Sequence, residues 1–229
     1  MRMARLSVSP DNSPDDPPGG PDPGPPRYLD QTLGEFLGTL SAGHAAPGGG
    51  SAAALTVALG ASLCAMAARL SAQQLAALDI EFLVAEAEQL RGSAASLVQA
   101  DAESYRGVVA ALRDQPGQDP GPASYLPDPD AEHQRQRIDA ALSEAATTPM
   151  EVLEIAAQTA RLAARLAAEG NPRLRGEAST AVLLVQAGAR AAAVLVSINL
   201  AASPGDKRPA RAEVLLAEIA AAVTGAAGA

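Results

Sequence analysis

The chain has 229 residues, of which 48% are hydrophobic but only 2% aromatic, and its formal net charge is −9. This length suits one domain, whose core has to be built from Ala, Leu and Val. The acidic balance argues against nucleic acid and against an anionic membrane surface as partners. A single cysteine excludes an internal disulfide and fits a reducing cytosol, so we expect a cytoplasmic protein.

The beginning of the chain differs in composition from the rest. Residues 1–27 are rich in Pro, Gly, Asp and Ser and contain no apolar stretch long enough for a signal peptide. Such a segment cannot bury enough apolar surface to offset its ordering entropy, so we predict a disordered tail. Residues 28–229 are predicted to form a single helical domain.

Helical patterns follow one another along this domain, and no stretch alternates with period two over a convincing length. Thr32 and Glu35 have the spacing of a capping box, and Thr148, Pro149 and Glu151 resemble a second helix start with Pro at the first helical position. The expected helices cover about 30–42, 51–70, 73–113, 130–146, 148–170, 177–202 and 208–224. The predicted fold is therefore an all-α helical bundle with long central helices.

Two of these helices are apolar nearly all round. Residues 45–68 lack charge over a length that could span a bilayer, but Gly48–Ser51 interrupt the stretch and the remainder is mainly Ala. A buried helix of a soluble protein is therefore favoured. One chain would struggle to cover both 51–70 and 177–202, which predicts a homodimer.

The long helix at 73–113 carries a carboxylate on an otherwise apolar stripe. The stripe follows steps of three and four through Leu90, Ala94, Leu97, Asp101, Tyr105, Val108 and Leu112. A buried ionised Asp is costly unless it is paired or hydrogen-bonded. Asp101 therefore needs a partner or a ligand; alternatively it caps a neighbouring helix or lies at the rim of the stripe.

The helix at 177–202 has polar residues at both ends of a similar stripe, Glu177 and Asn199. An amide such as Asn199 is more often a satisfied core residue than a ligand contact. His44, His133 and Cys64 do not form a plausible metal set, and Cys64 is expected to be a small core residue. No metal site is predicted.

The stretch HAAPGGGSAAAL, residues 44–55, has three successive glycines before an apolar run. It is either a flexible hinge or a helix start whose free amides approach a ligand or another helix closely. The residues alone support a helical protein with a Gly-rich helix start, and they do not name a reaction.

An ordered set of motifs adds to this description: APGGGSAAAL, AMAARLS, the segment Asp101–Tyr105, TPMEVL, EGNP and VSINL. In this order they resemble the cyclodeaminase/cyclohydrolase family, which includes the C-terminal half of formiminotransferase-cyclodeaminase and free-standing methenyltetrahydrofolate cyclohydrolases. The resemblance covers about residues 30–202 and extends to the last expected helix, which is nearly everything outside the predicted tail. It implies an all-helical homodimer that acts on one-carbon units carried by tetrahydrofolate, with the folate derivative as substrate and no permanently bound cofactor.

The resemblance also implies a site. Asp101 and Glu177 are the implied catalytic residues, with Asp101 stabilising a cationic folate species and relaying a proton. The implied substrate-binding residues are Pro47, Gly48, Gly49, Gly50, Ser51, Tyr105, Asn171 and Asn199. The reaction is either hydrolysis of 5,10-methenyltetrahydrofolate or closure of 5-formiminotetrahydrofolate with release of ammonia. The alternative is a divergent, non-catalytic member that acts as a dimeric ligand-binding module.

Two positions depart from the family pattern. A Gly-Lys-Tyr-like stretch usually follows the second helix of the family, and here it is replaced by residues 69–82 without Lys or Tyr. After GNP the family usually has Ser-Asp, where this chain has Gly176 and Glu177. Arg69, Arg173 and Arg175 are the residues that could replace the missing Lys in attracting the glutamate tail of folate.

Overall fold

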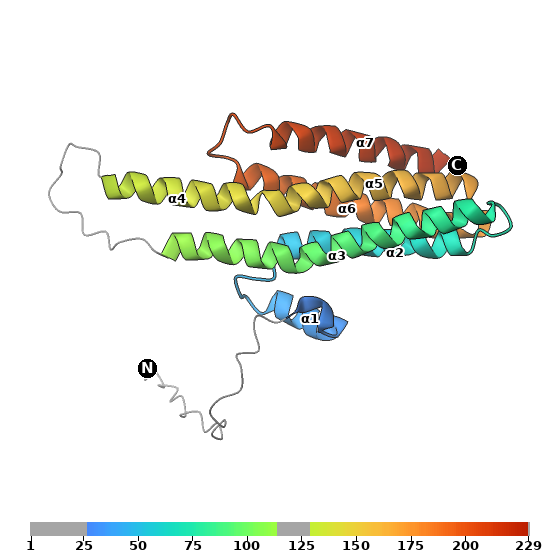
Figure 1. The fold of residues 1–229 in the computed structure, drawn as a ribbon, viewed down its shortest axis with the longest axis horizontal. Helices are drawn as coiled ribbons and strands as arrows, with labels where there is room; N and C mark the ends of the chain where they lie inside the picture. The colour runs from blue at the N-terminus through green and yellow to red at the C-terminus, as the bar shows by residue number, and fades with distance from the viewer. Residues whose placement is uncertain (1–26, 114–128, 229) are drawn as a thin grey trace, which may run out of the picture.

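A computed structural model describes residues 27–113 and 129–228, which form a bundle of long helices (Figure 1). Among these residues no strand occurs, and the predicted all-α fold is confirmed. All but the last residue of the predicted tail at 1–27, and most of the Pro-rich connection at 114–130, lie outside the described residues. The helices are α1 Leu33–Ser41, α2 Gly49–Arg69, α3 Ala77–Arg113, α4 Pro129–Ala145, α5 Thr147–Glu169, α6 Arg175–Asn199 and α7 Arg208–Gly228, with short 3-10 turns η1 Tyr28–Asp30 and η2 Pro172–Leu174.

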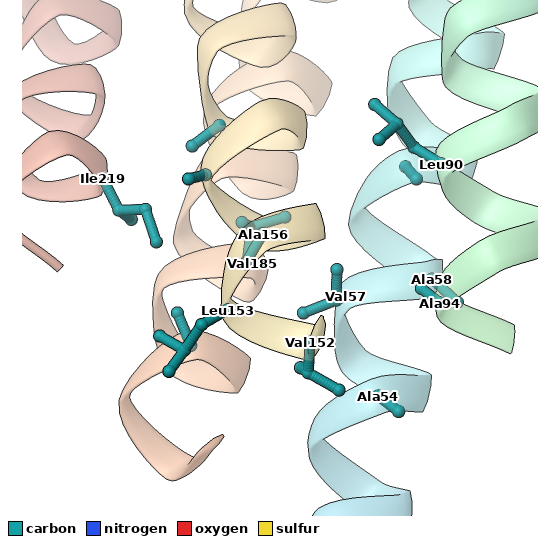
Figure 2. Packing of buried hydrophobic residues seen from close by; sticks show 14 of the residues in the cluster. Ala54, Val57, Ala58, Leu90, Ala94, Val152, Leu153, Ala156, Val185 and Ile219 are labelled. Atoms are coloured by element: carbon teal, nitrogen blue, oxygen red, sulfur yellow. The ribbon is translucent and has the colours of Figure 1, made fainter. Parts of the chain in front are cut away.

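Helix α5 is central and packs against α2, α3, α6 and α7. The core consists mostly of Ala, Val and Leu, and Figure 2 shows Val57, Val152 and Val185 among the small side chains between the helices. Because these side chains are small, backbones approach closely. A Cβ at Gly188 would lie only 2.9 Å from the carbonyl oxygen of Ala53, so α2 and α6 can cross at this distance only with glycine there.

The contacts between α2 and α6 also give their relative direction. Gly188 lies beside Ala53, whereas Gly60 lies beside Ala181 and Val185. Rising numbers in one helix meet falling numbers in the other, so the two helices are antiparallel. The beginning of α2 and the end of α6 are therefore at the same end of the bundle.

Both predicted helix starts lie within about one residue of the observed ones, but only one of the two predicted caps is confirmed. Thr32 forms a capping box, because its hydroxyl accepts from the Glu35 amide while the Glu35 carboxylate accepts from the Thr32 amide. Thr148 is not a cap: α5 begins at Thr147, and its N-cap Ala146 has helical dihedral angles. Helices α4 and α5 run on almost without interruption (Figure 1). Pro149 is tolerated in the first turn of α5 because the amides there have no intrahelical acceptor.

Helix α1 stands beside the bundle rather than within it (Figure 1). It is connected through η1, where the ring of Tyr28 packs edge-on against Phe36 with 6.2 Å between ring centroids. The Tyr28 amide donates to the side chain of Gln99 on α3. Leu33 and Leu37 of α1 remain exposed to solvent.

Two of the described helical segments, α2 and Pro172–Asn199, are long and apolar enough to cross a membrane. In α2, 61% of the apolar window is buried inside the bundle, as expected for a core helix. In the second segment only 44% is buried, because α6 has one apolar side that no other described helix covers. Length and composition alone do not distinguish these helices from membrane spans.

Candidate functional site

A cavity of about 330 Å³ lies at the end of the bundle where α2 begins and α6 ends. It is bounded by the start of α2, by α3, by the junction of α4 with α5, and by the last turn of α6. Its lining is mostly apolar or backbone, with few polar side chains, and consists of Ala45, Gly48, Gly49, Gly50, Asp101, Ser104, Tyr105, Ala145, Pro149, Leu195, Ile198 and Asn199.

The start of α2 and Asp101 of α3 form the polar wall of this cavity. Helix α2 has Gly48 as its N-cap, so no side chain of the cap residue satisfies its first amides. The carboxylate of Asp101 lies there instead, and the hydroxyl of Ser51 contacts both Asp101 Oδ2 and the carbonyl oxygen of Val98 at 2.9 Å. Asp101 thus both caps a neighbouring helix and lines the cavity.

Gly50 is the residue that makes room for this carboxylate. A Cβ at position 50 would overlap the Oδ1 atom of Asp101, whereas a Cβ at Gly49 would have no atom within 4 Å. The three glycines are therefore not equivalent: Gly50 permits the close approach of α3 to the helix start. A close-approach helix start, rather than a hinge, is what the stretch HAAPGGGS forms.

Burial raises the pKa of the Asp101 carboxyl, and hydrogen bonding by the side chain and backbone of Ser51 opposes this rise. Asp101 can keep its hydrogen bond to Ser51 in both the ionised and the protonated state. Ionised Asp101 accepts the single hydroxyl proton of Ser51, whereas protonated Asp101 can donate to Ser51 while Ser51 donates to Val98. A group that holds a proton in one state and accepts it in the other, beside a cavity, is suited to proton transfer.

The other polar groups of the lining come from α3 and α6. Asn199 is partly buried and donates from Nδ2 to the carbonyl oxygen of Ala145 at 3.1 Å, which fixes the orientation of its amide. Tyr105 and Ser104 lie one helical turn from Asp101. Asp101 is the only Asp, Glu, Lys, Arg or His in the described lining. A cationic ligand therefore meets no basic side chain there that would repel it.

The structure brings most of the candidate site residues together. Gly48, Gly49, Gly50, Asp101, Tyr105 and Asn199 line the cavity. Ser51 lies directly behind the lining, and Pro47 is buried without reaching it.

Two candidate residues, Asn171 and Glu177, are at the opposite end of the bundle. Asn171 connects two turns, since its amide N–H donates to Ser71 Oγ and its side chain to the carbonyl oxygen of Leu70, both at 2.9 Å. Glu177 begins α6, and the 22 residues from it to Asn199 correspond to about 33 Å of helix. Within one chain, Glu177 does not reach the cavity of Asp101.

Sequence reasoning missed six residues of the lining: Ala45, Ser104, Ala145, Pro149, Leu195 and Ile198. Ser104 could have been found, because it is three residues after Asp101 and shares its helix face. The others are apolar, and nothing in their spacing distinguishes a cavity wall from a core. Leu195 and Ile198 belong to the cavity only because α6 ends beside the start of α2.

The remaining reactive groups are not part of a site. Cys64 is fully buried, and burial raises the pKa of its thiol to about 12, which makes it an unreactive core residue. Among residues 27–113 and 129–228 no group of three His, Cys, Asp or Glu side chains has an arrangement that could hold a metal ion.

The fold and the cavity define the class of this protein as a helical bundle with a Gly-rich helix start opposite an aspartate. The family model described as formiminotransferase-cyclodeaminase matches residues 32–214. The chain belongs to this family.

Two relatives show the extent of the similarity. The chain is 28% identical over 174 residues to a methenyltetrahydrofolate cyclohydrolase of Methylorubrum extorquens, and the match covers 74% of this chain and 79% of the relative. Its fold is similar to the crystal structure of formiminotetrahydrofolate cyclodeaminase from Thermotoga maritima, with a TM-score of 0.70 and 23% identity. That match covers 86% of this chain and 92% of the other.

Proposed function

We propose that this protein is an enzyme of folate-linked one-carbon metabolism that hydrolyses 5,10-methenyltetrahydrofolate. The observation that carries the proposal is the position of Asp101, partly buried in a cavity wall without basic side chains, at the start of α2. The family and the cyclohydrolase relative support the choice of substrate. The same site is also suited to closure of 5-formiminotetrahydrofolate with release of ammonia, which proceeds through an adduct at the corresponding carbon.

The chemistry of hydrolysis matches what the cavity contains. The methenyl carbon lies between two nitrogens and shares their positive charge. An ionised Asp101 near this carbon stabilises the cation, and in a partly buried site such a carboxylate acts more strongly than it does in water. Its place at the start of α2, beside the Ser51 hydroxyl, holds the carboxylate in position.

Asp101 also provides for the proton transfers. A water molecule adds its oxygen to the methenyl carbon and gives one proton to Asp101. The bond from this carbon to one ring nitrogen then breaks, the hydroxyl proton is lost, and the leaving nitrogen takes up a proton. One proton is released overall, and Asp101 returns to its ionised state. General acid–base groups of this kind contribute about 10²–10⁴ in rate.

The two reactions are separated by parallel assays on the purified chain. Loss of the near-ultraviolet absorbance of 5,10-methenyltetrahydrofolate, measured against the spontaneous rate, reports hydrolysis. Ammonia release from 5-formiminotetrahydrofolate reports the cyclodeaminase reaction. We expect acceleration of the first reaction. Ammonia release alone would assign the chain to the second reaction, and binding of both compounds without turnover would support the alternative of a ligand-binding module.

A further inference from the structure

A groove between α3 and α4 adjoins the cavity of Asp101. Its volume is about 590 Å³, and Ser104 lines both spaces. At the end of α4, Ala145 lines the cavity and the preceding residue, Glu144, lines the groove. The two helices run side by side here (Figure 1). The groove continues the cavity along both helices, and we refer to it as the α3/α4 groove, lined by Ala100, Ser104 and Gly107 on α3 and by Ala141 and Glu144 on α4.

The cavity alone is small for a tetrahydrofolate. Pockets for drug-sized ligands range from about 300 to 1,000 Å³, and the cavity, at about 330 Å³, is at the lower end. A tetrahydrofolate consists of a bicyclic pterin, an aminobenzoyl ring and a glutamate, so one end of it has to extend beyond the cavity. The α3/α4 groove has space for such an end, because Ala100, Gly107 and Ala141 are small and a Cβ at Gly107 would meet no atom within 4 Å.

The α3/α4 groove is acidic. Glu103 and Glu144 are the only charged residues in its described lining. The carboxylate of Glu103 accepts from Gln99 at 2.9 Å, whereas no hydrogen bond or ion pair joins Glu144 to another described residue. Glu144 also lies in the last turn of α4, where the helix dipole disfavours a negative charge. Its carboxylate is therefore an acceptor that the described part of the fold leaves unused.

Arg208 does not reverse this charge. Its guanidinium lies at the margin of the groove, 3.4 Å from Oγ1 of Thr147. It is ion-paired with Asp206 at 2.7 Å, and it also donates to the backbone oxygen and the hydroxyl of Ser143. An anionic group in the groove would therefore meet two carboxylates, and no basic side chain of the described lining would attract it.

The two ends of the substrate differ in the chemistry they offer. The methenyl carbon joins a nitrogen of the pterin to the nitrogen of the aminobenzoyl group, so the two ends leave the reacting carbon on different sides. The glutamate end carries carboxylates, which Glu103 and Glu144 repel. The outer edge of the pterin carries a ring N–H beside its 2-amino group, and these parallel donors match the two oxygens of one carboxylate.

We propose that the pterin end of the substrate binds in the α3/α4 groove and that its outer edge donates two hydrogen bonds to Glu144. The reacting carbon then lies in the cavity beside Asp101, and the glutamate end leaves the cavity away from the groove. Glu144 determines the orientation of the substrate and takes no part in the proton transfers. This assignment rests on the proposed function, because it states how the substrate of that reaction is oriented.

A ligand that lacks one donor tests the contact with Glu144. Calorimetry gives the Kd of tetrahydrofolate and of its 2-desamino-2-methyl analogue for wild type, Glu144→Gln and Glu213→Gln. Glutamine keeps the shape of glutamate but has one acceptor oxygen and no charge. A hydrogen bond to a charged group is worth about tenfold in affinity. We expect Glu144→Gln to weaken binding of tetrahydrofolate by about this factor and binding of the analogue much less. Glu213, exposed on α7 and outside both linings, is the control with the same change of charge and should change neither Kd.

A larger side chain in the groove tests the place of the pterin independently of Glu144. Gly107 is exposed in the groove with open space around it, so Gly107→Leu fills part of the groove while the helix is retained. We expect this variant to weaken tetrahydrofolate binding by about tenfold or more, with the Tm of a folded protein. Gly92→Leu is the matched control, because Gly92 is also on α3 with open space around it but lies outside both linings.

The outcomes separate this assignment from the proposed function. Tighter binding of tetrahydrofolate by Glu144→Gln would place the glutamate end in the groove and overturn the assignment. Unchanged Kd values for Glu144→Gln and Gly107→Leu, in a protein that hydrolyses 5,10-methenyltetrahydrofolate, would overturn it and leave the proposed function intact. The expected changes in a protein without turnover would contradict the proposed function and support the orientation. A wild type that binds no tetrahydrofolate would contradict both.

Discussion

The contact between Gly50 and Asp101 makes the sharpest prediction for stability and activity together. In Gly50→Ala the new methyl group overlaps the Asp101 carboxylate, which has to move. An alanine inside a helix normally adds about 0.5–1 kcal/mol of stability over glycine. Separation of Asp101 from Ser51 leaves buried polar groups without partners, at a cost of about 1–3 kcal/mol. We expect Gly50→Ala to be less stable than wild type by up to about 2 kcal/mol.

Gly49→Ala is the matched control, because a Cβ there meets no atom within 4 Å. For a domain of this size each kcal/mol corresponds to about 2–4 °C in Tm, which calorimetry measures readily. Displacement of a catalytic group by about 1 Å costs about a hundredfold in rate, so kcat of Gly50→Ala should fall by about this factor. In an Asp101→Ala background the collision is absent, and Gly50→Ala should then be more stable than its parent by about 0.5–1 kcal/mol. Equal Tm values for Gly50→Ala and Gly49→Ala would refute the reasoning.

Three further predictions follow from other contacts. Burial raises the pKa of Asp101, so its contribution to stability is fully present below the ordinary pKa of an aspartate and is lost as pH rises through the raised pKa. Between these two pKa values the Tm of wild type should fall relative to that of Asp101→Asn, and a Tm difference that does not change with pH would contradict this prediction. Gly188→Ala should lose about 1–3 kcal/mol in denaturant unfolding, because its Cβ meets the backbone of α2, whereas Gly225→Ala, in open space, should not; equal stability would show that the crossing can relax. Arg208 hydrogen-bonds at 2.7 Å both to the end of α4 and to the connection before α7, so Arg208→Ala should cost about 1–2 kcal/mol, and a loss no larger than that of the exposed Arg211→Ala would contradict this role.

The helical bundle was predictable because its signals are local. Apolar residues repeat at steps of three and four through α3 and α6, and the capping box at Thr32 depends on four adjacent residues. The cap of α5 was mispredicted for a related reason. Thr148, Pro149 and Glu151 have the spacing of a cap, but α4 continues almost directly into α5, and no local pattern reports that continuity.

The site was predictable only in part because it joins residues that are far apart in the chain. Asp101 stood out as a carboxylate on an apolar stripe. The glycines before Ser51 stood out because ordering three successive glycines costs backbone entropy. Their contact depends on how closely α3 approaches α2, which the identity of Gly50 permits. The apolar wall formed by Leu195 and Ile198 could not be predicted, since it depends on the antiparallel packing of α6 against α2.

The most direct test of the account compares wild type with Asp101→Asn in hydrolysis of 5,10-methenyltetrahydrofolate. Asparagine has nearly the same shape and can still hydrogen-bond to Ser51, but it carries no charge and does not exchange a proton. We predict that wild type accelerates the loss of absorbance over the spontaneous rate and that Asp101→Asn lowers kcat by about 10²–10⁴ at unchanged fold, as judged by circular dichroism. An Asp101→Asn variant with the kcat of wild type would contradict the central claim that this carboxylate carries out the reaction.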